Sequence, residues 1–158
     1  MAFKGMNPAR FVASAAVLVM LLAGSVAGGA ADEIKAARGF MLRVYVEGVR
    51  NSTGVVGYLV FDSSHGWPDT MKDALRMDAV PAQEGTTLVE MPDLRAGDYG
   101  VLVIHDENSN KKLDRDWKGM PKEQWGMSNN PRVYLSAPSY ERAKFHVAQA
   151  TDIHIVLK

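Results

Sequence analysis

The chain of 158 residues contains no cysteine, which excludes disulfide bonds, thiolate metal sites and cysteine nucleophiles. A lipid-modified cysteine of the kind that anchors lipoproteins is excluded for the same reason. Basic and acidic residues are balanced at 18 each and no basic block occurs, so nucleic acid is not expected as a partner. The sequence also lacks a nucleophile elbow, a phosphate loop, a dinucleotide fingerprint and an HExxH helix.

Long hydrophobic runs are scarce, and the clearest one lies at the N-terminus. Lys4 and Arg10 precede the apolar residues 11–22, and a series of small residues follows. This three-part pattern is typical of a secretory signal peptide. The apolar core is shorter than the roughly 20 residues that a membrane span needs. We therefore expect residues 1–30 to be a cleaved signal peptide and the protein to be periplasmic or secreted, without a stable membrane span; an uncleaved anchor is the alternative.

The rest of the chain is predicted to be a mobile leader over residues 31–39 and one domain over residues 40–158. About 125 residues are enough for one ordinary hydrophobic core. Because no disulfide is available, such an exported domain must rely on that core or on a bound ion.

Alternation of apolar and polar residues predicts strands along most of this domain. They are expected over residues 42–47, 55–61, 77–81, 86–91, 101–104, 143–147 and 153–157. One short helix is expected near Met71, where helical spacing follows a capping-box signal. The first two strands are expected to form a hairpin, and the last two to pair through a turn centred on Gln149. The continuously apolar strand ending at Ile104 is expected to be central. Tyr99 at its entrance is expected to hydrogen-bond back to the preceding turn, and the alternative is a plain core tyrosine.

These elements favour an all-β fold, a single antiparallel β-sandwich of about seven strands in the outline of an immunoglobulin-like domain. A closed barrel is the alternative. The residues from 117 to 138 form a long irregular loop, a feature that is usually functional or packed on itself.

Several segments together resemble one family of exported bacterial proteins, known as domain of unknown function 2141. The segments are residues 46–51, 66–69, 94–99, 105–114 and 119–130. The resemblance covers about residues 42–158 and implies a β-sandwich with a transthyretin-like outline; the family's activity is unassigned. Trp125 and Met127 stand where the resemblance implies other aromatic residues, and both changes stay apolar.

A polar loop follows the central strand and offers ligands for a hard cation. Carboxylate and carboxamide groups recur at alternate positions, as in calcium loops that begin D-x-[DN]-x-[DN]-G. The expected ligands are Asp106, Asn108, Asn110, the Lys112 carbonyl, Asp114 and Asp116. Lys111 replaces the glycine of that pattern and Trp117 stands in place of its closing glutamate, so we expect weak calcium binding, in the roughly 0.1–1 mM range. The alternative is a series of Asx-turns without an ion.

Two further groups of residues are candidates for function. His105, beside the loop, is the catalytic candidate for a base, and its alternative role is to hold the loop's shape. Aromatic and polar residues of the irregular segment form a candidate ligand surface, or else a satellite core. That surface comprises Trp117, Glu123, Trp125, Asn129 and Asn130.

The sequence therefore favours an exported, non-catalytic binding or envelope-associated module, with a small molecule or an envelope protein as its partner. One alternative is a small metal-dependent hydrolase with His105 as the base. It requires His105 and two acids to converge on an open cleft. The other alternative is a purely structural envelope protein, which requires an exposed apolar patch and no pocket.

Overall fold

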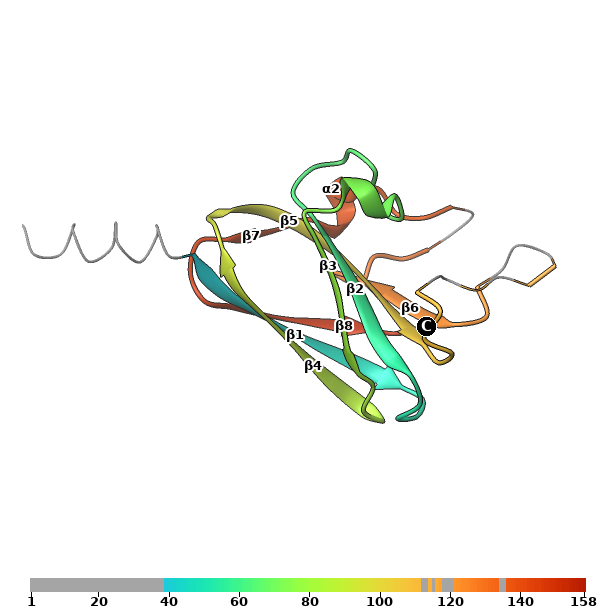
Figure 1. Ribbon diagram of the computed structural model, residues 1–158. Helices are drawn as coiled ribbons and strands as arrows, with labels where there is room; N and C mark the ends of the chain where they lie inside the picture. Colours follow the sequence, from blue (N-terminus) through green and yellow to red (C-terminus); the bar gives the residue numbers. More distant parts are fainter. Residues whose placement is uncertain (1–38, 112–113, 115, 118–120, 134–135) are drawn as a thin grey trace, which may run out of the picture.

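The computed structural model describes residues 39–111, 114, 116–117, 121–133 and 136–158, in which two β-sheets face each other (Figure 1). The first sheet has the order β4 (Gly85–Leu94), β1 (Phe40–Val49), β8 (Thr151–Val156). The second has the order β3 (Arg76–Pro81), β2 (Val55–Phe61), β5 (Gly97–Asp106), β6 (Gln124–Met127), and β7 (Phe145–Val147) also pairs with β5. The all-β prediction is confirmed, and residues 1–30 and 31–38 lie outside the described residues.

The main core lies between the two sheets, as the alternation in the sequence predicts. In β1, Leu42, Val44 and Val46 are fully buried, while their neighbours are partly exposed. They pack against the core-facing residues of the second sheet, such as Val101 and Val103 of β5. A side-chain period of two therefore places one apolar set of each strand in this core.

Strand β5 is central in the second sheet, as its continuous apolarity predicts. It pairs with β2 on one side and with β6 and β7 on the other. At its entrance, the Tyr99 hydroxyl donates a 2.9 Å hydrogen bond to the Arg95 carbonyl oxygen, so the prediction for this tyrosine is confirmed.

Both predicted hairpins are wrong, and one strand pair is parallel. β1 pairs with β4 and β8, while β2 pairs with β3 and β5, so β1 and β2 lie in different sheets. β7 and β8 are likewise separated, because β7 joins β5 and β8 lies parallel to β1. The physical reason is that alternation decides which face of a strand is apolar but not which strand lies beside it.

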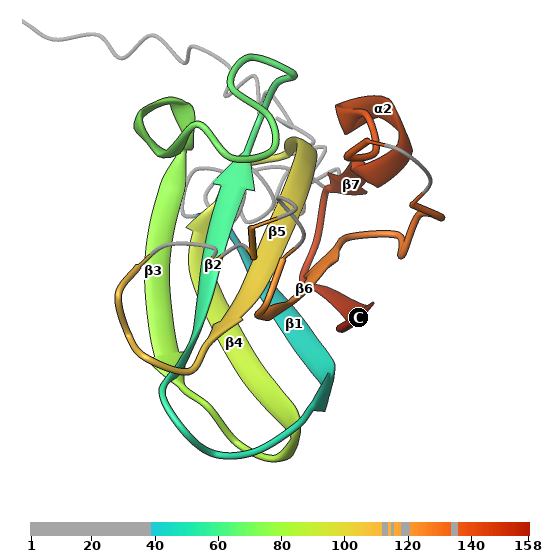
Figure 2. The ribbon, with the colours of Figure 1, turned by 90° about the vertical axis from the view of Figure 1, so that its right-hand side faces the viewer.

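Two short helical segments cross one end of the second sheet. The 3-10 helix η1 (Met71–Asp73) confirms a short helix here, but Thr70 makes no side-chain cap, so the capping-box prediction is wrong. The helix α2 (Tyr140–Ala143) precedes β7. Figure 2 shows β3, β2 and β5 side by side, with β1 and β4 behind them and α2 beyond β5.

Candidate functional site

The outer face of the second sheet is apolar, although it faces away from the main core. Strand register places Gly57 of β2 between Ala79 of β3 and Ile104 of β5. Two pairs further along, on the same face, Leu59 lies beside Leu102. An antiparallel sheet usually presents polar side chains on the face that is not packed, so this apolar face needs a covering or a ligand.

A satellite core covers one half of this outer face. Trp67 packs edge-on against Phe61 and Tyr140, and its indole nitrogen donates a 2.8 Å hydrogen bond to the Pro138 carbonyl oxygen. Gly100 of β5 permits this approach, because a Cβ there would lie 2.8 Å from the Trp67 ring. Burial raises the pKa of Tyr140 to about 12, with the charge of Asp98 as the next cause, so its phenol stays neutral.

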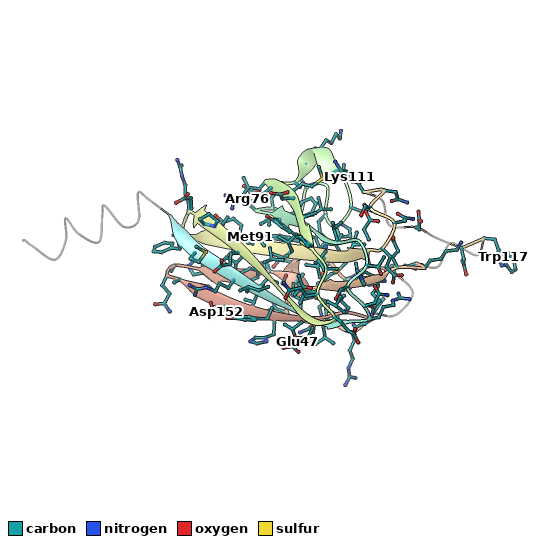
Figure 3. All side chains as sticks on the ribbon, turned by 60° about the horizontal axis from the view of Figure 1, so that its bottom comes forward. Glu47, Arg76, Met91, Lys111, Trp117 and Asp152 are labelled. Atoms are coloured by element: carbon teal, nitrogen blue, oxygen red, sulfur yellow. The ribbon has the colours of Figure 1, made fainter. Side chains whose placement is uncertain are left out.

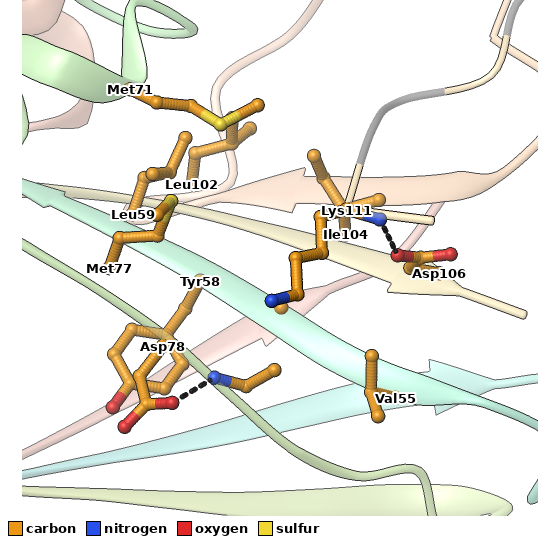
Figure 4. A pocket seen from close by; sticks show the side chains of 12 residues that line it. Val55, Tyr58, Leu59, Met71, Met77, Asp78, Leu102, Ile104, Asp106 and Lys111 are labelled. Carbon is orange, nitrogen blue, oxygen red and sulfur yellow. Dashed lines mark hydrogen bonds between the residues drawn. The ribbon is translucent and has the colours of Figure 1, made fainter. Parts of the chain in front are cut away.

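The other half of the outer face is an open groove of about 200 Å³ (Figure 4). Gly57 forms part of its floor, and a Cβ added there would meet the Ile104 carbonyl oxygen at 4.0 Å and nothing nearer. The remaining lining comes from β2, β3, β5, η1 and the polar loop. These residues are Val55, Tyr58, Leu59, Met71, Met77, Asp78, Ala79, Leu102, Ile104, Asp106 and Lys111.

The polar loop closes one end of the groove through Asp106. This side chain is buried, and its two carboxylate oxygens accept hydrogen bonds from the backbone N–H groups of Asn110 at 3.1 Å and Lys111 at 2.6 Å. Asn110 and Lys111 therefore return to the sheet, and Lys111 reaches the groove. Figure 2 shows the orange segment after β5 turning in front of β3.

The remaining loop residues bind one another. The Asn108 amide donates to Asp114 Oδ2 at 2.8 Å, and the Asn110 amide donates to Asp114 Oδ1 at 3.1 Å. Asn108 Oδ1 also accepts the Asn110 N–H, which is an Asx-turn. Lys112 lies outside the described residues. Among those described, Asp116 included, no group of three or more acidic or histidine side chains is placed to hold a metal; the calcium site stays a prediction.

Glu123 joins the loop to β6 and is largely buried. Its Oε2 accepts the Asp114 N–H at 3.1 Å, and its carboxyl group shares a side-chain hydrogen bond with Asp106. Burial raises the pKa of Glu123, and the nearby charges of Asp106 and Asp114 raise it further. The Asp114 N–H acts in the opposite direction, because it donates to the Glu123 carboxylate and lowers this pKa.

His105 is fully buried at the end of the main core, opposite the groove face. Its Nε2 donates a 2.9 Å hydrogen bond to the Thr53 carbonyl oxygen, and its Nδ1 lies 3.4 Å from Gln124 Oε1. Glu107 Oε1 is 3.9 Å from Nδ1 and is paired with Arg50 at 2.9 Å. The described residues therefore do not assemble the open cleft of His105 and acids that a hydrolase requires; His105 connects the β1–β2 loop to the sheet.

The predicted ligand surface is spread over four separate places. Trp117 is 88% exposed and stands out from the end of the molecule (Figure 3). Trp125 packs against the satellite core instead. The amides of Asn129 and Asn130 donate to the carbonyl oxygens of Lys144 and His154, and both residues have a positive φ. The structure therefore uses the two asparagines to shape a turn, while Glu123 belongs to the loop.

The groove itself was missed at the level of sequence. Its clearest signal is Gly57, a glycine inside an otherwise apolar strand, which often marks a close approach by another group. Met71 and Met77 give a second signal, because they are 43% and 56% exposed where most apolar residues are buried. Unbranched methionines at a surface are typical of adaptable apolar recognition.

Fold and site together define a β-sandwich with an apolar groove on the outer face of its second sheet. The chain belongs to the family DUF2141, described as "Uncharacterized protein conserved in bacteria", whose family model matches residues 44–154. Neither a curated protein nor a solved structure matches the chain. Within the described residues, no helix is both long and apolar enough to cross a bilayer.

Proposed function

We propose that this protein is an exported, non-catalytic binding module that holds a small apolar ligand in the groove over Gly57. The single observation that carries the proposal is an uncovered apolar trough on a sheet face whose other half is buried under a satellite core. Its volume of about 200 Å³ is below the roughly 300–1,000 Å³ of sites for drug-sized ligands, which favours a small ligand.

The use of the polar groups supports a binding role over a catalytic one. The Asp106 oxygens accept backbone N–H groups, and the His105 Nε2 is bonded to a backbone carbonyl oxygen, so both side chains maintain the shape of the loop end. A purely structural envelope protein would need no pocket, and the groove therefore also favours a binding module over that alternative.

Titration with a neutral apolar dye, N-phenylnaphthylamine, tests the groove by fluorescence. Gly57→Val adds a side chain to the floor, and Gly57 is not among the glycines with a positive φ, so the strand tolerates the change. We expect this variant to lose affinity by about tenfold or more, because the branched side chain occupies the site.

A matched pair of variants controls for changes in surface hydrophobicity. Met77→Gln alters an exposed residue of the groove, and Leu88→Gln alters an exposed residue on the outer face of the first sheet. We expect only Met77→Gln to weaken dye binding. Equal binding by the wild type, Gly57→Val and Met77→Gln, all with unchanged circular dichroism, would refute the groove as the site.

Export is the second part of the proposal and rests on the pattern of residues 1–30. Expression of the full chain in a bacterium, followed by separation of the periplasm and intact mass measurement, tests it. We expect a periplasmic product that begins near Ala31. A cytoplasmic product that keeps Met1 to Ala30 would contradict export.

A further inference from the structure

The groove has one charged end and one apolar end. Figure 4 shows Met71, Leu59 and Leu102 together at one end, and Asp106 with the base of Lys111 at the other. An apolar ligand without a head group would leave this charged end unused. The polarity of the groove therefore matches a ligand that is itself apolar at one end and charged at the other.

Lys111 supplies the charge that selects the head group. Its backbone N–H is held by Asp106 at 2.6 Å and its φ is 63°, so the loop tip directs the side chain out over the sheet. In Figure 4 this side chain runs across the groove towards the side where Tyr58 and Asp78 lie. Its ammonium group makes no ion pair with any side chain in the described part of the protein.

Both acidic side chains of the lining accept hydrogen bonds from backbone N–H groups. Asp106 accepts two backbone N–H groups, and Asp78 on β3 accepts the N–H of Ala79 at 2.8 Å. Burial raises the pKa of Tyr58, and the charge of Asp78 raises it further, so this phenol is neutral at neutral pH. Lys111 carries the positive charge of the lining, and its ammonium group is the one that would pair with an anionic head group.

We propose, as an extension of the proposed function on which it rests, that the groove binds a free short-chain alkyl carboxylate. The alkyl chain lies over Gly57 towards the two methionines, and the carboxylate accepts a hydrogen bond from Lys111 Nζ. An apolar cavity of about 150 Å³ holds one benzene molecule, so about 200 Å³ suits one short chain and not a two-chain lipid.

Octanoate and its uncharged analogue octanamide, measured by calorimetry and by amide chemical shifts, test the head group. We expect the wild type to bind octanoate about tenfold more tightly, since one hydrogen bond to a charged group has that effect. Lys111→Gln should abolish the preference, while Lys72→Gln on η1, which is exposed and outside the groove, should keep it. Added salt should weaken octanoate binding alone.

The outcomes separate this inference from the proposed function. Equal binding of the two compounds by the wild type, or a preference that survives Lys111→Gln, would overturn the carboxylate proposal. If Gly57→Val still blocked octanamide binding, the groove would stand as the binding site. Failure of both compounds to bind would also overturn it, and the dye titration would then decide the groove separately. Co-sedimentation with phosphatidylglycerol vesicles that Gly57→Val abolishes would overturn a free ligand in favour of a lipid surface.

Discussion

Glu123 shows at the scale of a single residue how the loop is held to the sheet. Its carboxyl group accepts the Asp114 N–H and shares a hydrogen bond with Asp106, which itself binds two loop N–H groups. The carboxyl groups of Asp106 and Glu123 thus share a largely buried site. Burial raises the pKa of Glu123, which favours its protonated form beside the Asp106 carboxyl group.

Glu123→Gln should stabilise the protein at neutral pH and leave it unchanged in acid. Burial raises the pKa of Glu123 in the folded state above its usual 4.5, so at low pH both states are protonated and its contribution is fully present. As the pH rises from 4.5 to the raised folded pKa, the unfolded state ionises first and that stability is lost. Glutamine stays neutral and can donate to Asp106 as protonated Glu123 does.

Thermal melting of the wild type and Glu123→Gln across this pH range measures the effect as a difference in Tm. The control is Glu84→Gln, at an exposed position in the turn between β3 and β4. The difference in Tm between this variant and the wild type should not change with pH. A Tm of Glu123→Gln below that of the wild type at neutral pH would show that the carboxylate is needed in its ionised form.

At the scale of elements, the loop from Asp106 to Asp114 has the Asx-turn that the sequence suggested as the alternative to a calcium site. Its Asx-turn, its internal hydrogen bonds and the bond from the Asp114 N–H to Glu123 hold its shape. The same oxygens are those that calcium would use, so an ion would have to compete with the N–H groups of Asn110 and Lys111.

The calcium prediction requires the melting temperature of the mature domain to rise from EDTA through a calcium series of several millimolar. Ligand linkage makes the increase grow with concentration, and magnesium is the control ion. Asp106→Ala and Asp114→Ala should abolish the response, and Asp62→Ala, exposed and distant in sequence, should keep it. Asp106→Ala should also lower stability by about 1–3 kcal/mol, because it removes the buried carboxylate that accepts the N–H groups of Asn110 and Lys111.

An unchanged Tm at every calcium concentration would contradict the ion site and assign the loop to its hydrogen bonds alone. A rise that Asp106→Ala does not affect would place calcium elsewhere on the protein. The proposed groove does not depend on either result, because its floor is set by the register of β2 with β3 and β5.

At the scale of the whole molecule, local pattern and long-range pairing differ in how far the sequence reveals them. Alternation in Leu42, Val44 and Val46 predicts a strand and its buried face, and the structure confirms both. The same apolar set can face the core beside β2 or beside β4 and β8, so the pattern cannot decide the partner. The short connection after Val49 favoured a hairpin, but the chain crosses there to the other sheet.

The groove depends on the same long-range pairing and was therefore beyond the sequence. Gly57 forms part of a trough because register places it beside Ile104 and Ala79, and because the satellite core stops short of it. Lys111 reaches the trough because Asp106 turns the loop back over the sheet. The sequence identifies the polar residues of the loop, but the direction of the loop over the sheet depends on tertiary contacts.

The parallel pairing of β1 with β8 can be tested directly because the chain has no cysteine of its own. Tyr45 and His154 are register partners on the outer face of the first sheet, with rings stacked at 5.0 Å. Replacing both with cysteine should give an intramolecular disulfide that closes a loop of about 110 residues. The chain-entropy model gives about 4.7 kcal/mol for such a loop, and engineered disulfides typically deliver roughly 2–4 kcal/mol of stabilisation. The hairpin excluded by the structure would instead join cysteines at positions 146 and 152. Non-reducing electrophoresis and melting of both double variants should therefore show a fast, stabilising disulfide for the first pair and none for the second, and the reverse result would reject this topology.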